Sequence, residues 1–282
     1  MHARLRLLIP LSLLVILSLS CSLVSNMFTP QAEGGTTPGT VAPPAEPTLA
    51  AGTVELGTPT EAVRRKVLPP TPTPFAVTSK DDVRSILDLS QPTYVDYFDD
   101  PTLWFDYDTP GRAGYKVEDS HLVGVDYDPE EIYTWWSYTD KRADDVYAEI
   151  SATNGDCVGK DSVGFVIHSD LETGAGGYSL EVSCDGNFRF RLMRQGKSPV
   201  EMIKWAAAPV INTGKDATNR LGIWDSRARL VLFVNGQQVA KVNDPNVTYA
   251  WGNFALYVRA SQTYNLTATF DDFAFWKVPY LE

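Results

Sequence analysis

The sequence predicts an all-β protein, an antiparallel β-sandwich of the jelly-roll type, which follows a signal peptide and a disordered linker. Short runs with alternating apolar side chains recur through residues 79–282, and turn-forming pairs such as Asn235-Gly236 separate several of them. Composition marks the start of the domain, because all seven tryptophans lie after residue 78. A stretch of about 200 residues is long enough to bury a single core.

The first 20 residues have the layout of a signal peptide. Arg4 and Arg6 precede a largely apolar run over residues 7–19, and small residues end this run next to Cys21. A membrane-spanning helix needs about 20 apolar residues, and this run is shorter. We therefore expect the protein to be exported from the cytoplasm.

A cysteine directly after such a run resembles the lipidation site of bacterial lipoproteins. The resemblance implies that Cys21 receives a diacylglycerol and that residues 1–20 are removed. It also implies that the exported protein is lipid-anchored on the extracytoplasmic face of a bacterial membrane. The alternatives are an ordinary signal peptide that is cut nearby and an uncleaved anchor, and in both of them Cys21 has no role.

Residues 21–78 predict a disordered tether between the lipidated cysteine and the domain. Beyond residue 27 they are rich in Pro, Thr, Gly and Ala and hold almost no aromatic side chains. Such a segment cannot bury enough apolar surface to offset the entropy lost on ordering. At about 3 Å per residue, residues 27–78 have a contour length of about 150 Å.

The remaining two cysteines, Cys157 and Cys184, both lie in the domain. If Cys21 is lipidated, they form an even pair, and an exported pair is expected to oxidise. We therefore predict a disulfide between them, and the alternative is two buried free thiols.

The clearest strand pair is RLVLFVNGQQVAKV, residues 229–242, in which Asn235-Gly236 predicts a type I′ hairpin turn. A two-residue loop pairs Val234 with Gln237 and places Leu232 opposite Val239, so that apolar side chains share one face. A second tight turn at Asp185-Gly186 places Cys184 at the end of a strand.

Further strand-like runs recur at short spacing through the domain, and only SKDDVRSILDL at residues 79–89 predicts a short helix. The predicted strands are YVDYF at 94–98, DVYAEISAT at 145–153, SVGFVIHS at 162–169, YSLEVSC at 178–184, NFRFRLM at 187–193, NRLGIW at 219–224, GNFALYV at 252–258 and TATFDDFAFWKV at 267–278.

The order of these segments, above all the NGQ hairpin and the terminal FDDFAFW, resembles the concanavalin A-like lectin/glucanase jelly rolls of bacterial exported proteins. It is similar to laminin-G-like domains and to domains named for 3-keto-disaccharide hydrolases. The resemblance covers residues 94–278. It implies the fold, and none of its segments is a catalytic motif.

We predict no catalytic residue. Retaining glucanases of this fold use the motif E-x-D-x-x-E, which sets two carboxylates at the separation that double displacement needs, and the string does not occur here. Glu149 and Glu181 are expected to be solvated or paired across strands. His121 and His168 are expected to be ordinary strand residues.

A structural calcium is a possible cofactor. Carbohydrate modules that resemble this domain often hold calcium between their first and last strands. Asp96, Asp99 and Asp100 lie near the first predicted strand, and Asp271 and Asp272 lie in the last, where alternation lets only one of the two face a given site. The alternative is a solvent-facing acidic edge, which prevents edge-to-edge pairing.

Aromatic residues around IYTWWSYTDKR are the candidate glycan platform. Trp135 and Trp136 are neighbours and must point to opposite faces, and Tyr133, Tyr138 and Trp104 lie close in sequence. The alternative is that these side chains fill the core.

Three functions follow. The first is an envelope-anchored, lectin-like module that binds a glycan or cell-envelope polymer. The second is a saccharide-acting hydrolase, and the third is a structural or protein-binding module of a surface complex. Nucleic acid is a poor partner, because the chain carries a net charge of −11.

Overall fold

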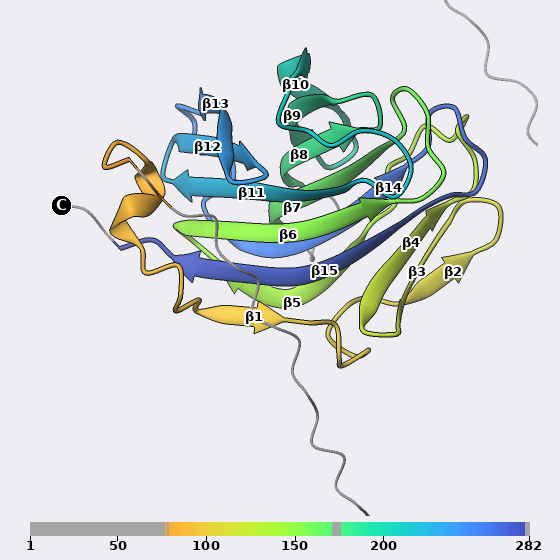
Figure 1. Ribbon diagram of the computed structural model, residues 1–282, viewed down its shortest axis with the longest axis horizontal. Coiled ribbons are helices and arrows are strands. Elements are labelled where there is room, and N and C mark those ends of the chain that lie inside the picture. The colour runs from red at the N-terminus through yellow and green to blue at the C-terminus, as the bar shows by residue number, and fades with distance from the viewer. Residues whose placement is uncertain (1–76, 78, 171–175, 280–282) are drawn as a thin grey trace, which may run out of the picture. The chain divides into compact units, whose positions relative to one another are not determined.

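The computed structural model describes residue 77, residues 79–170 and residues 176–279, which form an antiparallel β-sandwich (Figure 1). The predicted fold class is therefore confirmed. The predicted signal peptide, Cys21 and all but one residue of the predicted linker lie outside the described residues. Among the described residues, no helix has the length and apolar character needed to cross a membrane.

One sheet has nine strands, in the order β13-β12-β11-β6-β15-β4-β3-β2, and β1 pairs with β15. Its strands are β1 (Tyr94–Asp96), β2 (Tyr107–Thr109), β3 (Ala113–Glu118), β4 (His121–Asp126), β6 (Val146–Asn154), β11 (Thr218–Ser226), β12 (Arg229–Val234), β13 (Gln237–Asn243) and β15 (Leu266–Lys277).

The other sheet has six strands, in the order β10-β9-β8-β7-β14-β5. They are β5 (Ser137–Ala143), β7 (Ser162–Ser169), β8 (Gly177–Ser183), β9 (Asn187–Arg194), β10 (Lys197–Ala207) and β14 (Gly252–Arg259). The chain passes repeatedly from one sheet to the other, as between β5, β6 and β7 and between β13, β14 and β15, which is typical of a jelly roll.

The core lies between the sheets and follows from strand alternation. In β8, Tyr178, Leu180 and Val182 point into the core, whereas Ser179 and Glu181 lie on the outer face of the six-stranded sheet. Each large apolar side chain that is fully buried in this way stabilises the fold by about 1.5–3 kcal/mol.

The amino-terminal segment packs on the outer face of the nine-stranded sheet. The short helix expected at residues 79–89 is a single 3-10 turn, η1 (Val83–Ile86), which begins at Asp82. Its Arg84 is buried with its guanidinium 3.9 Å from the Phe233 ring centre. The Arg84 side chain also donates to the Gly236 carbonyl at 2.8 Å, so the segment is held beside the β12–β13 turn.

The β12–β13 hairpin confirms the predicted turn but corrects its register. Asn235 and Gly236 have φ of 49° and 75°, as a type I′ turn requires, and Val234 pairs with Gln237. Leu232, however, lies opposite Ala240 rather than Val239. A bulge inserts one extra residue into β13, which lets both Val239 and Ala240 pack against the core.

The predicted disulfide is formed between Cys157 and Cys184, whose Cα atoms lie 5.9 Å apart. Cys184 directly follows β8, and the Gly186 amide donates to the Ser183 carbonyl at 3.1 Å. The predicted tight turn therefore places this cysteine at the strand end, and the disulfide ties the β6–β7 connection to the end of β8.

Candidate functional site

An aromatic groove of about 580 Å³ lies at the start of edge strand β5. Four of the five residues predicted as a glycan platform line it, together with residues of β2 and the chain before it. The lining residues are Phe105, Tyr107, Thr109, Arg112, Tyr133, Thr134, Trp135, Trp136 and Tyr138. We call this surface the aromatic groove.

The two neighbouring tryptophans diverge, as expected from their adjacency. Trp135 packs against the core between the sheets, whereas Trp136 packs against Tyr257 and its apolar neighbours on the outer face of the six-stranded sheet. Both lie just before β5 rather than within a strand, and both are half-buried. The Trp135 ring therefore supports the groove from inside the sandwich, and the Trp136 ring extends it over the outer face of the six-stranded sheet.

Among the aromatic side chains that line the groove, the most exposed are Tyr133, at 62%, and Phe105, at 46%. Phe105 stacks on Tyr138, with ring centres 4.8 Å apart and planes 9° apart. The Phe105 amide also donates to the Tyr138 carbonyl at 2.9 Å. This backbone contact fixes Phe105 beside β5 and sets the two rings as one continuous apolar surface.

Trp104 does not belong to this surface, which corrects the predicted platform. It is 3% exposed, its indole N–H donates to Asp96 at 2.9 Å, and its ring meets Phe273 edge-on at 5.5 Å. Adjacent residues in an extended chain point to opposite sides, so Trp104 enters the core where Phe105 enters the groove. Phe105 is the residue that the sequence analysis missed.

Polar groups lie at the rim of the groove. The Arg112 guanidinium lies 5.6 Å from the Trp135 ring centre and is paired with Glu131 at 3.4 Å. The Thr134 hydroxyl accepts from Arg259 at 2.9 Å. The groove therefore combines exposed aromatic faces with hydroxyl and guanidinium groups at its edge.

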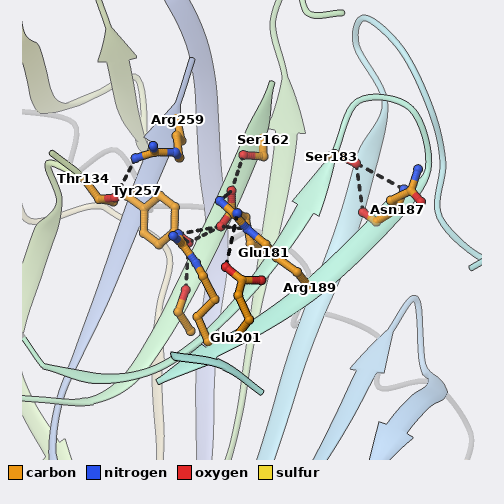
Figure 2. A network of polar contacts seen from close by, with 11 residues as sticks. Thr134, Ser162, Glu181, Ser183, Asn187, Arg189, Glu201, Tyr257 and Arg259 are labelled. Atoms are coloured by element: carbon orange, nitrogen blue, oxygen red, sulfur yellow. Dashed lines mark hydrogen bonds and ion pairs between the residues drawn. The ribbon is translucent and has the colours of Figure 1, made fainter. Parts of the chain in front are cut away.

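Beside the groove, a buried ionic network covers the outer face of the six-stranded sheet (Figure 2). Glu181 accepts from Arg189 at 2.8 Å, Arg191 at 2.7 Å, Ser162 at 2.6 Å and Tyr257 at 2.8 Å. Burial alone raises the pKa of Glu181, but Arg191 and Arg189 outweigh it and hold the pKa at about 2. Glu181 is therefore an ionised structural anion at neutral pH.

The network also depends on a close approach between β7 and β14. Gly164 pairs with Tyr257, whose ring lies across the glycine. A Cβ atom at Gly164 would lie 2.0 Å from the Tyr257 ring carbon Cζ, so no larger residue leaves this ring in place. The hydroxyl of Tyr257 is thereby held against Glu181.

Glu149 is paired in a similar way on the outer face of the nine-stranded sheet. Its carboxylate accepts from Arg220 of β11 at 2.6 Å and from the Tyr147 hydroxyl. Of the two roles expected for Glu149 and Glu181, pairing across strands is therefore confirmed for both.

His168 is not the ordinary strand residue that the sequence suggests. A bulge in β7 opposite β14 gives it a φ of 56°, and its Nε2 lies 2.9 Å from Asp225 Oδ2 of the other sheet. Both side chains are buried. His121, in β4, lies at the surface with Nε2 3.8 Å from Asp271 Oδ2.

The aspartates expected to hold calcium each make separate contacts. Asp96 accepts from the Phe98 amide at 2.8 Å as well as from Trp104. Asp271 and Asp272 lie at a bulge of β15, where strict alternation is interrupted. Asp99 accepts from the Ser120 hydroxyl at 3.2 Å. The described residues hold no group of three or more His, Cys, Asp or Glu placed to bind a metal ion.

A scan against protein-family models finds no match, and a search of curated proteins finds no relative. Similar solved structures include the carbohydrate-binding module CBM66 from Bacillus subtilis, with 17% sequence identity and a TM-score of 0.43 over 63% of this chain and 97% of that one. A structure described for endo-acting O-glycanases of the human gut microbiota is 11% identical, with a TM-score of 0.48 over 67% and 100%. A Bacillus subtilis protein of unknown function with a galectin-like fold is 12% identical, with a TM-score of 0.48 over 66% and 96%.

Proposed function

We propose that this domain is a lectin-like module that binds a glycan through the aromatic groove. The observation that carries the proposal is that the stacked rings of Phe105 and Tyr138 and the exposed ring of Tyr133 line one groove with polar groups. The C–H faces of a sugar ring pack on aromatic rings, and its hydroxyls need hydrogen-bonding partners at the edge of the site. The groove offers both in a volume of about 580 Å³.

The lining of the groove favours binding over hydrolysis. Glycoside hydrolysis uses two carboxyl groups on either side of the scissile bond. No residue that lines the groove is an Asp or a Glu. The nearby Glu181 is fully buried and neutralised by two arginines, so it is not available as a general acid or nucleophile.

The described amino-terminal segment and the groove lie near opposite edges of the nine-stranded sheet. Arg84 anchors the amino-terminal segment beside the β12–β13 turn, whereas Tyr107 and Thr109 of the groove belong to β2. In the order of the nine-stranded sheet, β13 and β2 are the two opposite edges. The described segment that includes Arg84 therefore does not cover the groove.

We propose further that the protein is exported and lipid-anchored through Cys21. The Cys157–Cys184 disulfide supports export, because such bonds persist in oxidising compartments. In cells fed a fatty-acid probe, the wild-type protein should be labelled and should fractionate with membranes, and Cys21→Ser should do neither. Equal labelling and equal membrane association of the variant would refute the anchor.

Glycan binding is tested by calorimetric titration of the full-length protein against purified glycans and envelope polymers, with and without calcium. The proposal expects saturable binding to at least one of them and its loss in Tyr133→Ala. Tyr264→Ala is the matched control, because Tyr264 is also 62% exposed but lines none of the hollows described here. Absence of binding across the panel would refute the proposal and favour a structural or protein-binding module.

A further inference from the structure

A second hollow with an exposed aromatic residue lies at the other end of β5. Trp251 is 59% exposed, and the Arg142 guanidinium lies 5.4 Å from its ring centre. The hollow has a volume of about 490 Å³. It is lined by Arg142, Ala143, Asp144, Ala250, Trp251 and Lys277. We call it the Trp251 hollow.

Strand register places Tyr138 of the aromatic groove and Arg142 of the Trp251 hollow on the same face of the six-stranded sheet. Tyr138 of the aromatic groove pairs with Ala255, and Arg142 of the Trp251 hollow pairs with Asn253. Between these pairs β14 advances by two residues and β5 by four, so a bulge changes the register but preserves the alternation of faces. Phe254 points into the core, which leaves Asn253 and Ala255, and with them Arg142 and Tyr138, on the outer face.

The Trp251 hollow carries hydrogen-bond donors as well as an aromatic face. Among the described residues, neither Arg142 nor Lys277 has an ion-pair partner, although both line the hollow. An arginine supplies five N–H donors and a lysine three. Asp144 adds an acceptor at the rim. Beside an exposed indole, these groups repeat the combination of ring face and polar edge found in the aromatic groove.

We propose that the Trp251 hollow is a second subsite for the same ligand, so that the ligand is a linear polysaccharide running along β5. This inference rests on the proposed glycan binding. Trp251 lies four residues before Ala255, the partner of Tyr138, and four residues of extended chain span about 13 Å, which is longer than one pyranose ring. A monosaccharide or a short terminal group fills one hollow, whereas a chain of several sugars reaches both.

The test is the dependence of affinity on chain length. The full-length protein is titrated with oligosaccharides of one to six units of glucose, xylose, mannose and N-acetylglucosamine. For a series that binds, wild-type affinity should rise with length up to the chain that spans both hollows. Trp251→Ala should weaken binding of the longest oligomers about tenfold and leave the shortest binding oligomer unchanged.

The outcomes separate the two proposals. Tyr264→Ala should keep the full dependence on length, and thermal unfolding midpoints of both variants should confirm that they are folded. Binding that does not depend on length, or that is equally tight in wild type and Trp251→Ala for every oligomer, would overturn the second subsite and leave the aromatic groove intact. No binding of any oligomer would overturn both.

Discussion

At the scale of single residues, partners decide what each charged or aromatic side chain does. Glu181 lies at the centre of the smaller sheet, where a lone carboxylate is destabilising, and it is tolerated because Arg189 and Arg191 both reach it. Trp104 and Phe105 are adjacent in sequence but point to opposite sides of the chain. Trp104 is buried beside Asp96, and Phe105 faces the groove.

The Glu181 network predicts a dependence of stability on pH. The folded pKa of about 2 lies below the unfolded value of 4.5, so the contribution of Glu181 is complete above pH 4.5 and is lost as the pH falls towards 2. Its size is about 3 kcal/mol. Urea unfolding of the wild type measured from pH 7 to pH 2 should show this loss. Glu181→Gln should be less stable than the wild type at pH 7, and its free energy of unfolding should fall less as the pH is lowered.

The exposed Glu130 provides the control for this measurement, because its side chain is not part of the network. Glu130→Gln should keep both the wild-type stability at neutral pH and its loss in acid. If Glu181→Gln behaved in the same way as Glu130→Gln, the structural role of the network would be wrong.

The pair Trp104 and Phe105 predicts two separable effects. Trp104→Ala should lower the free energy of unfolding by about 3–5 kcal/mol, because it opens a cavity in the core. Phe105→Ala removes a half-exposed ring, so it should weaken glycan binding while changing stability far less. Urea denaturation and calorimetric titration of both variants check this, and a Phe105→Ala variant that binds as wild type would exclude Phe105 from the binding surface.

At the scale of strands and turns, local signals could be predicted from the sequence, whereas irregularities could not. The Asn235-Gly236 turn depends on two residues that tolerate positive φ, so the sequence alone specifies it. Strict alternation paired Val239 with the wrong partner, and the sequence did not predict the buried contact of His168, because each residue lies at a bulge that tertiary packing selects. The groove was predicted through the aromatic run before β5, but Phe105 joins it only through its long-range contact with Tyr138.

The amino-terminal segment predicts an effect of Arg84 on stability alone. Arg84 donates to the Gly236 carbonyl at 2.8 Å and to the Tyr147 hydroxyl at 3.2 Å, and it stacks on Phe233. Arg84→Ala should lower the free energy of unfolding by about 2–4 kcal/mol and leave glycan affinity unchanged. Lys80→Ala, in the exposed part of the same segment, should change neither the free energy of unfolding nor glycan affinity. Wild-type stability of Arg84→Ala would show that the segment is not anchored as described.

At the scale of the whole molecule, the disulfide makes stability depend on the redox state of the two cysteines. The bond spans 27 residues of sequence, and a loop of this length stabilises the fold by about 3–4 kcal/mol in the chain-entropy model. The double variant Cys157→Ala, Cys184→Ala should lose this amount in urea unfolding. Dithiothreitol should destabilise the wild type by a similar amount and leave the double variant unchanged, and an equal effect on both proteins would contradict the role of the bond.

The amino-terminal segment and the two aromatic hollows occupy different parts of the domain. The amino-terminal segment packs on the outer face of the nine-stranded sheet. Both aromatic hollows lie beside edge strand β5, where Tyr107 and Thr109 of β2 and Lys277 of β15 complete their linings. The described amino-terminal segment therefore lines neither hollow.

The central claim, that the aromatic groove binds a glycan, is tested most directly by a crystal structure of the domain with an oligosaccharide that binds in calorimetry. The account predicts a sugar ring packed on Tyr133, Phe105 or Tyr138, with its hydroxyls directed to the rim that includes Arg112 and Thr134. A sugar bound elsewhere on the molecule, with the groove unoccupied, would contradict it.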